Sequence, residues 1–118
     1  MATSTIKIPS ANKVKVTSLT YTFGGKNWIF YKVDRIVVVL APSDITSASA
    51  GMNDITTSLP AEYRPSTQCY IGNQNAGNDN QSKCFLVISS TGAVKFYTPV
   101  AIASAQNCGI CGCYITAS

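Results

Sequence analysis

A chain of 118 residues is long enough for one domain with its own core, and too short for a catalytic domain joined to a partner domain. Only 12% of the residues are charged and 46% are hydrophobic, so we expect some apolar surface to lie against other copies of the chain. The basic residues are scattered, the longest apolar run (36–41) is short, and no secretory signal is recognisable; we therefore expect neither nucleic-acid binding nor membrane insertion.

The first half of the chain predicts an arm followed by three strands. Residues 1–12 are polar and contain Pro9, and we divide the chain into this N-terminal arm and a single β head domain at 13–118. Within 13–23, β-branched and aromatic residues alternate with period two, which is typical of a strand. Residues 36–41 are apolar on both faces and are expected in the middle of a sheet. The predicted strands of this half are 13–23, 28–33 and 36–41.

The second half predicts a corner between shorter strands. A small, polar segment at 43–53 is expected to cross between two sheets. The Ser90-Thr91-Gly92 sequence supplies turn chemistry between two strand-like runs and predicts a hairpin. Between two others lies an amide-rich loop at 73–81, which is too polar for a core. The predicted strands are 54–58, 67–72, 82–89, 93–98 and 112–116.

These elements define the fold class. They amount to about eight short strands with turn signals at the spacing of a sandwich or barrel. The connections are short, so the pairing is expected to be antiparallel. No helical periodicity longer than two turns is present. The sequence therefore predicts an all-β, antiparallel sandwich or barrel, jelly-roll-like in outline.

The sequence lacks several residues and motifs that are typical of catalytic sites. There is no histidine, which excludes Ser-His-Asp and Cys-His nucleophilic systems and histidine metal sites. A glycosidase pair needs two carboxylates facing one bond, and nothing in the sequence brings two acids together. We favour solvated turn positions for all five acids. No GxGxxG or P-loop pattern occurs either. We expect no enzymatic activity, no catalytic residue and no cofactor. The acids are Asp34, Asp44, Asp54, Glu62 and Asp79.

The cysteines leave three interpretations open. Cys108 and Cys111 have CxxC spacing, which can hold zinc or form a labile disulfide. No second CxxC exists, so we expect no metal site. Cys111 and Cys113 share one face of the predicted last strand, where they can fill a core as reduced thiols. We favour buried reduced thiols for the set of Cys69, Cys84, Cys108, Cys111 and Cys113.

The amide-rich loop is the candidate recognition surface. Asn, Gln and Asp offer paired donors and acceptors that suit sugar hydroxyls, and aromatic rings usually accompany them because sugar C–H faces stack on rings. A merely solvated loop is the alternative. For Trp28 alone we favour core packing, because the single Trp of a small β domain is usually buried. Tyr31 and Tyr70 are further aromatic residues in reach. The candidate ligand-binding residues are Asn73, Asn75, Asn78, Asp79, Asn80, Trp28 and Tyr97.

A corner motif gives the sequence a resemblance. The run Leu59-Pro60-x-x-Tyr63-Arg64-Pro65 is followed by a strand, a polar loop, the hairpin at 85–96 and a closing Tyr114-Ile115 strand. This pattern, over residues 14–117, resembles the head domains of receptor-binding proteins from bacteriophage tail fibres and baseplates of the siphophage type. The chain has no heptad or shoulder segment of the kind that usually precedes such heads.

The resemblance implies a homotrimeric head at the phage tail tip, part of the virion and assembled in host cytoplasm, where thiols stay reduced. Its partners would be a host-surface saccharide, bound without cleavage, and other tail or baseplate proteins. The alternative is a purely structural trimerising fibre or capsid-decoration module. A depolymerising enzyme is a third hypothesis, which would need converging acids.

The corner also has a physical interpretation. Pro60 and Pro65 restrict the preceding residues to extended conformations. In an extended segment Glu62 and Arg64 point to the same side, where a salt bridge or backbone hydrogen bonds would brace the turn. We therefore expect Tyr63 and Arg64 to act as scaffold first and as ligand contacts second.

Overall fold

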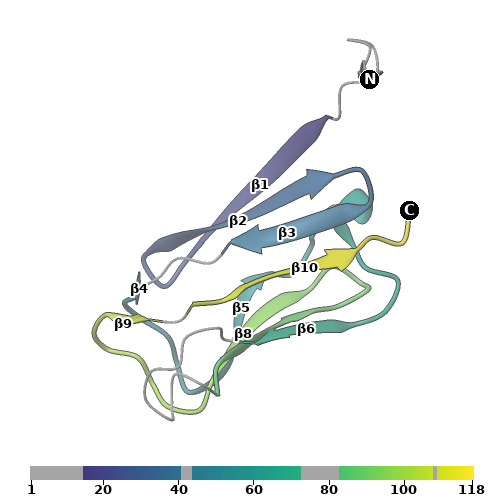
Figure 1. Cartoon of the computed structure of the whole chain (residues 1–118). Helices are drawn as coiled ribbons and strands as arrows, with labels where there is room; N and C mark the ends of the chain where they lie inside the picture. Colours follow the sequence, from purple (N-terminus) through teal and green to yellow (C-terminus); the bar gives the residue numbers. More distant parts are fainter. Residues whose placement is uncertain (1–14, 41–43, 73–82, 108) are drawn as a thin grey trace, which may run out of the picture.

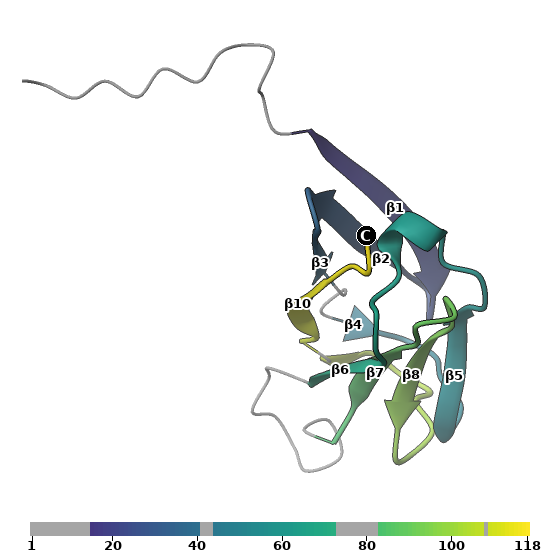
Figure 2. The same cartoon turned by 90° about the vertical axis from the view of Figure 1, so that its right-hand side faces the viewer.

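A computed structural model describes residues 15–40, 44–72, 83–107 and 109–118. The chain forms two four-stranded antiparallel sheets that pack together as a sandwich (Figures 1 and 2). The strands do not close into a barrel. The all-β prediction is confirmed, and the described residues contain no helix that could cross a membrane. The predicted N-terminal arm lies outside the described residues.

The first sheet is a meander closed by the C-terminal strand. Its order is β1-β2-β3-β10. Gly24 and Gly25 form the β1–β2 turn with φ of 62° and 76°, and Asp34 adopts φ of 55° in the tip between β2 and β3. As predicted, β3 lies inside the sheet, paired with β2 and β10. The strands are β1 (Val16–Phe23), β2 (Lys26–Val33), β3 (Ile36–Leu40) and β10 (Cys111–Ile115).

The second sheet is built around the predicted hairpin. Its order is β5-β8-β7-β6, and β7 and β8 pair across the turn that contains Gly92. The chain crosses between the sheets after β3, as predicted, and on the way forms the short strand β4 (Asp44–Ile45), which pairs with β9 (Gln106–Asn107). The main strands are β5 (Gly51–Thr56), β6 (Cys69–Gly72), β7 (Phe85–Ile88) and β8 (Val94–Thr98).

The core fills the space between the sheets. Because side chains alternate along a strand, every second residue of each strand faces inward, and most of the buried side chains at these positions are apolar. An aromatic group joins the two layers: Trp28 lies 5.6 Å from Phe96 and 6.1 Å from Phe23 between ring centroids. The largest buried core residues also include Phe30, Ile45, Leu59, Leu86, Ile88, Ile110, Val37, Val39 and Val94.

The same alternation gives each sheet an outer face. On the second sheet the outer positions carry aromatic, apolar and charged residues. On the first sheet they carry no charged residue. We call this surface the charge-free face; it consists of Val16, Ser18 and Thr20 of β1, Ile29, Tyr31 and Val33 of β2, Ile36, Val38 and Leu40 of β3, and Cys111, Cys113 and Ile115 of β10.

The corner at residues 59–65 is more tightly wound than predicted. Ala61–Tyr63 form a 3₁₀ turn, with the Tyr63 and Arg64 amides donating to the Pro60 and Ala61 carbonyls. Residues in this turn are not extended, so Glu62 and Arg64 do not form the salt bridge we considered. Arg64 instead donates from Nε to the Leu59 carbonyl oxygen at 2.6 Å. The turn is therefore braced by a hydrogen bond to the backbone, which was the alternative to a salt bridge.

This corner connects both sheets at the end of the sandwich where the C-terminus lies (Figures 1 and 2). Tyr63 is 3% exposed. Its carbonyl accepts a 2.6 Å hydrogen bond from the Tyr114 hydroxyl of β10, and its own hydroxyl lies 2.6 Å from Thr17 Oγ1 of β1. The Leu59 amide donates to the Gly92 carbonyl in the β7–β8 turn. Tyr63 and Arg64 are scaffold residues, as predicted.

Candidate binding surface

An aromatic ridge runs across the outer face of the second sheet. It consists of Tyr70 of β6, Phe85 of β7 and Tyr97 of β8. Phe85 and Tyr97 are paired in register, and their rings stack with centroids 4.8 Å apart and planes 22° from parallel. Tyr70 follows at 6.1 Å from Phe85 in an edge-on arrangement and is 64% exposed. Rings held by neighbouring strands in this way form a rigid apolar strip on the surface.

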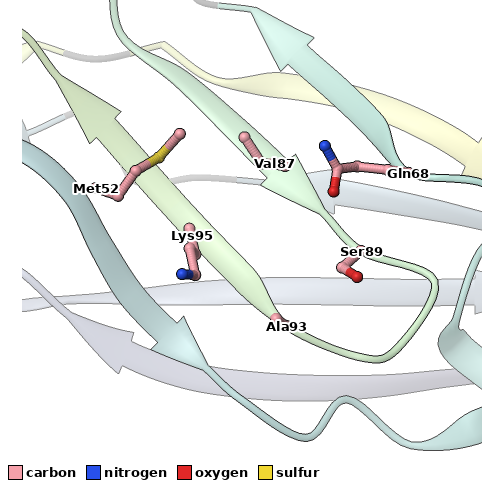
Figure 3. Close-up of a pocket in the computed structure, with 6 residues that line it drawn as sticks. All are labelled: Met52, Gln68, Val87, Ser89, Ala93 and Lys95. Atoms are coloured by element: carbon pink, nitrogen blue, oxygen red, sulfur yellow. The ribbon is translucent and has the colours of Figure 1, made fainter.

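A hollow of about 330 Å³ lies beside the ridge on the same face. Figure 3 shows the six residues that line it, with the strands of the other sheet passing behind them. The hollow adjoins the ridge because Val87 is paired with Tyr70, and Met52 with Tyr97. Its lining residues are Met52, Gln68, Val87, Ser89, Ala93 and Lys95.

Polar groups surround these apolar surfaces. Lys95 Nζ lies 3.8 Å from Asp54 Oδ1, and both side chains are about half exposed. The Gln68 amide donates from Nε2 to the Tyr70 hydroxyl at 2.5 Å, which orients both groups at the border of the ridge and leaves the amide oxygen as an acceptor. The surface therefore combines ring faces with fixed donors and acceptors.

This arrangement suits the binding of a ligand with apolar faces and polar groups. Aromatic faces with nearby amide and charged groups bind the C–H faces and hydroxyls of a sugar. Hydrolysis would need two carboxylates across one bond. Among the described residues, Asp54 is the single acid on the strands of the second sheet.

The predicted ligand-binding residues have three different outcomes. Tyr97 lies on the aromatic ridge. Asn73, Asn75, Asn78, Asp79 and Asn80 lie outside the described residues, in the segment that joins β6 to β7. Trp28 is fully buried and donates from Nε1 to the Phe23 carbonyl. Its ring presents no face to a ligand, so the core-packing interpretation of Trp28 is the correct one.

The cysteine interpretation was right for one residue and wrong for two. Cys84 is buried. Cys111 and Cys113 do share one face of β10, but this is the exposed outer face, where both are free thiols. Cys69 is half-buried, and this burial raises the pKa of its thiol. In the part of the chain that is described, no three Cys, Asp or Glu side chains form a group that could hold a metal ion. Cys108 is outside that part.

Comparison with known proteins does not assign this chain to a family. The sequence matches no protein-family model and no curated protein.

Proposed function

We propose that this chain is a non-catalytic binding head that attaches a phage tail to a saccharide on the host surface. The observation on which the proposal depends is the aromatic ridge with its adjoining hollow. A chain with little charge places three rings in a row on a solvent-exposed sheet, although burying them in the core would remove more apolar surface from water. A ligand with apolar faces gives such a strip a use.

The sequence pattern supports the phage context. The Leu59-to-Pro65 corner and the 85–96 hairpin resemble tail-associated receptor-binding heads, which implies a homotrimer that docks onto other tail or baseplate proteins. A shallow site binds one sugar weakly, and several copies in one assembly raise the avidity. The virion tail tip is the location that this function requires.

A structural module is the second candidate. It would use the same sandwich to assemble and cap a fibre or capsid without binding a ligand. The charge-free face of the first sheet favours a role in assembly, and this role is compatible with either candidate. Binding of a saccharide separates them.

The test is binding of purified protein to host cell-wall polysaccharide and to a glycan array. We expect Tyr70→Ala and Phe85→Ala each to weaken binding about two- to tenfold, because one stacking contact contributes about 0.5–1.5 kcal/mol. Tyr70→Phe keeps the ring and is expected to retain most of the affinity.

Circular dichroism of each variant checks that the sandwich is intact. Retention of wild-type affinity by both alanine variants would reject the ridge as the site. Failure of the wild-type protein to bind any saccharide would favour the structural module.

A further inference from the structure

The charge-free face is unusual for a sheet that meets water. An antiparallel sheet with one buried face normally has polar residues on the other. Here the outer residues of β2 and β3 are Ile, Val, Leu and Tyr, apart from Asn27 near the start of β2. Several residues of the face are widely exposed: Ile115 of β10 65%, Val16 of β1 58%, and Ile36 48% and Leu40 42% of β3. Surfaces of this kind mark interaction sites.

Charges are kept off this face even on strands that contain them. Both lysines of β2, Lys26 and Lys32, occupy the alternate positions that share the side of Trp28 and Phe30. Lys32 extends its ammonium over the Tyr63 ring at 5.8 Å. The three cross-strand rows on the charge-free face contain no charged residue. The middle row runs Ser18, Tyr31, Val38, Cys113.

We infer that the charge-free face binds the same face of further copies of this chain. A partner with charged side chains would lose their hydration here and find no opposite charge. Another copy brings an identical uncharged surface, which makes the contact self-complementary in chemistry. In a homotrimer the three charge-free faces would surround the threefold axis, each in contact with the other two.

The size of the face agrees with such a contact. Four strands spaced about 4.8 Å apart and five to eight residues long cover a flat footprint of about 320–500 Å². Side-chain relief makes the accessible area larger than this footprint. Stable interfaces bury about 800 Å² on each partner, so the flat footprint alone accounts for about half of that area. Ser18 and Thr20 of the edge strand β1 provide a polar border.

This inference deepens the homotrimeric part of the proposed function by naming the surface that holds the copies together. It does not depend on which ligand the ridge binds, because the two surfaces lie on opposite sides of the sandwich. The assembly and the ligand site can therefore be tested separately.

The experiment is sedimentation equilibrium of the full chain between about 1 and 100 µM. We expect wild-type protein to be oligomeric. Val38→Lys places a charge in the middle of the face and is expected to raise the dissociation constant at least 100-fold, because an unpaired charge would be buried. The control, Val100→Lys, changes a valine that is 43% exposed and lies outside both outer faces; it is expected to assemble as wild type.

A milder variant protects the test against misfolding. Ile36→Ser combined with Ile115→Ser removes two exposed apolar side chains without adding charge, and circular dichroism and thermal melting report whether each variant is folded. A second readout is alkylation of Cys113 by maleimide, followed by peptide mass spectrometry. Cys113 should be protected in the wild-type oligomer and should react in the dissociated variants.

The outcomes are distinct. Dissociation of the face variants with the Val100→Lys control intact supports the inference. A monomeric wild-type protein at 100 µM overturns it, and so does an oligomer that survives both face variants with a reactive Cys113. The ridge is tested independently by measuring saccharide affinity of the dissociated, folded variants at a single site, which this inference predicts to be unchanged.

Discussion

The guanidinium of Arg64 occupies the space that a side chain on Gly92 would need. A Cβ built on Gly92 would lie 2.9 Å from Arg64 Nε and 2.9 Å from the Leu59 carbonyl oxygen. These two atoms are themselves joined by a hydrogen bond, and the Leu59 amide donates to the Gly92 carbonyl. The corner and the β7–β8 turn thus form one packed unit, and this packing needs a glycine.

Replacement of Gly92 by alanine should be strongly destabilising. Gly92 has φ of 101°, where a side chain is strained by about 1–2 kcal/mol, and the clash with the Arg64–Leu59 contact adds about 1–3 kcal/mol of overpacking. Gly51→Ala is the matched control, because Gly51 has φ of 94° but nothing within 4 Å of its Cβ position. Chemical denaturation should show Gly92→Ala as the less stable of the two; equal losses would contradict the clash.

Tyr114 should make the stability of the sandwich depend on alkaline pH. Its hydroxyl is buried and donates to the Tyr63 carbonyl. Burial, with smaller contributions from Cys69, Tyr21 and Tyr63, raises the pKa of Tyr114 above its ordinary range. The unfolded chain therefore loses this proton near pH 10, while the folded chain keeps it.

The sign follows from this difference. The contribution of Tyr114 is complete below about pH 10 and is lost as pH rises toward the folded pKa, with a slope approaching about 1.4 kcal/mol per pH unit. Tyr114→Phe should cost about 1–2 kcal/mol at pH 7 and should flatten the decline above pH 10. Urea denaturation of both proteins from pH 7 to 11 measures the two slopes, and parallel slopes would refute the assignment.

The strands and their pairing could be predicted from the sequence because alternation and turns determine them together. The 90–92 turn fixes the β7–β8 register, and the β-branched run of residues 36–39 belongs inside a sheet on composition alone. The two-residue strands β4 and β9 were missed. Their pairing joins segments about sixty residues apart, and so short a segment has no periodicity to read.

Which face of a strand points inward was harder to predict, and β10 shows why. Cys111 and Cys113 lie on one side of this strand and Gly112 lies on the other. Because cysteine side chains are apolar, the sequence suggests that the cysteines face the core. In the structure Gly112 faces inward toward Ile71 of β6, and a Cβ there would lie 2.8 Å from Ile71 Cγ2. Close approach of β6 selects the glycine side, and only the packing of two distant strands reveals that.

The candidate site could be predicted only in part, because the sequence does not show which side of each strand faces the solvent. Tyr97 was predicted as a ligand contact because its ring can stack on a sugar. Its partner Phe85 follows from the hairpin register, since the two residues lie opposite each other across the predicted turn. For Trp28 the favoured core-packing interpretation was right and the ligand-contact alternative was wrong; the sequence could not decide between them alone, because an aromatic residue does not show which side of its strand faces inward. In this chain Trp28 shares the inward side of β2 with Phe30.

The Asp54–Lys95 pair should contribute little to stability. Its atoms are 3.8 Å apart, and the side chains are 59% and 46% exposed, respectively. Solvent screening at such positions limits an ion pair to a small effect. Asp54→Asn should change the unfolding free energy by less than about 0.5 kcal/mol, with no dependence on added salt beyond that of wild type. A loss above 1 kcal/mol in low salt would show that the pair has a structural role.

Phe85 and Phe96 should have opposite roles, although they lie on paired strands of one sheet. Phe96 is fully buried against Trp28 and Phe23, and Phe96→Ala should cost about 3–5 kcal/mol of stability. Phe85 lies on the outer face between Tyr70 and Tyr97, so Phe85→Ala should cost about 1 kcal/mol and weaken saccharide binding about two- to tenfold. Thermal melts and binding isotherms of both variants, made with the same protein preparations, compare the two effects. If Phe85→Ala unfolds the protein as readily as Phe96→Ala, the ridge belongs to the core and is not a surface available to ligands.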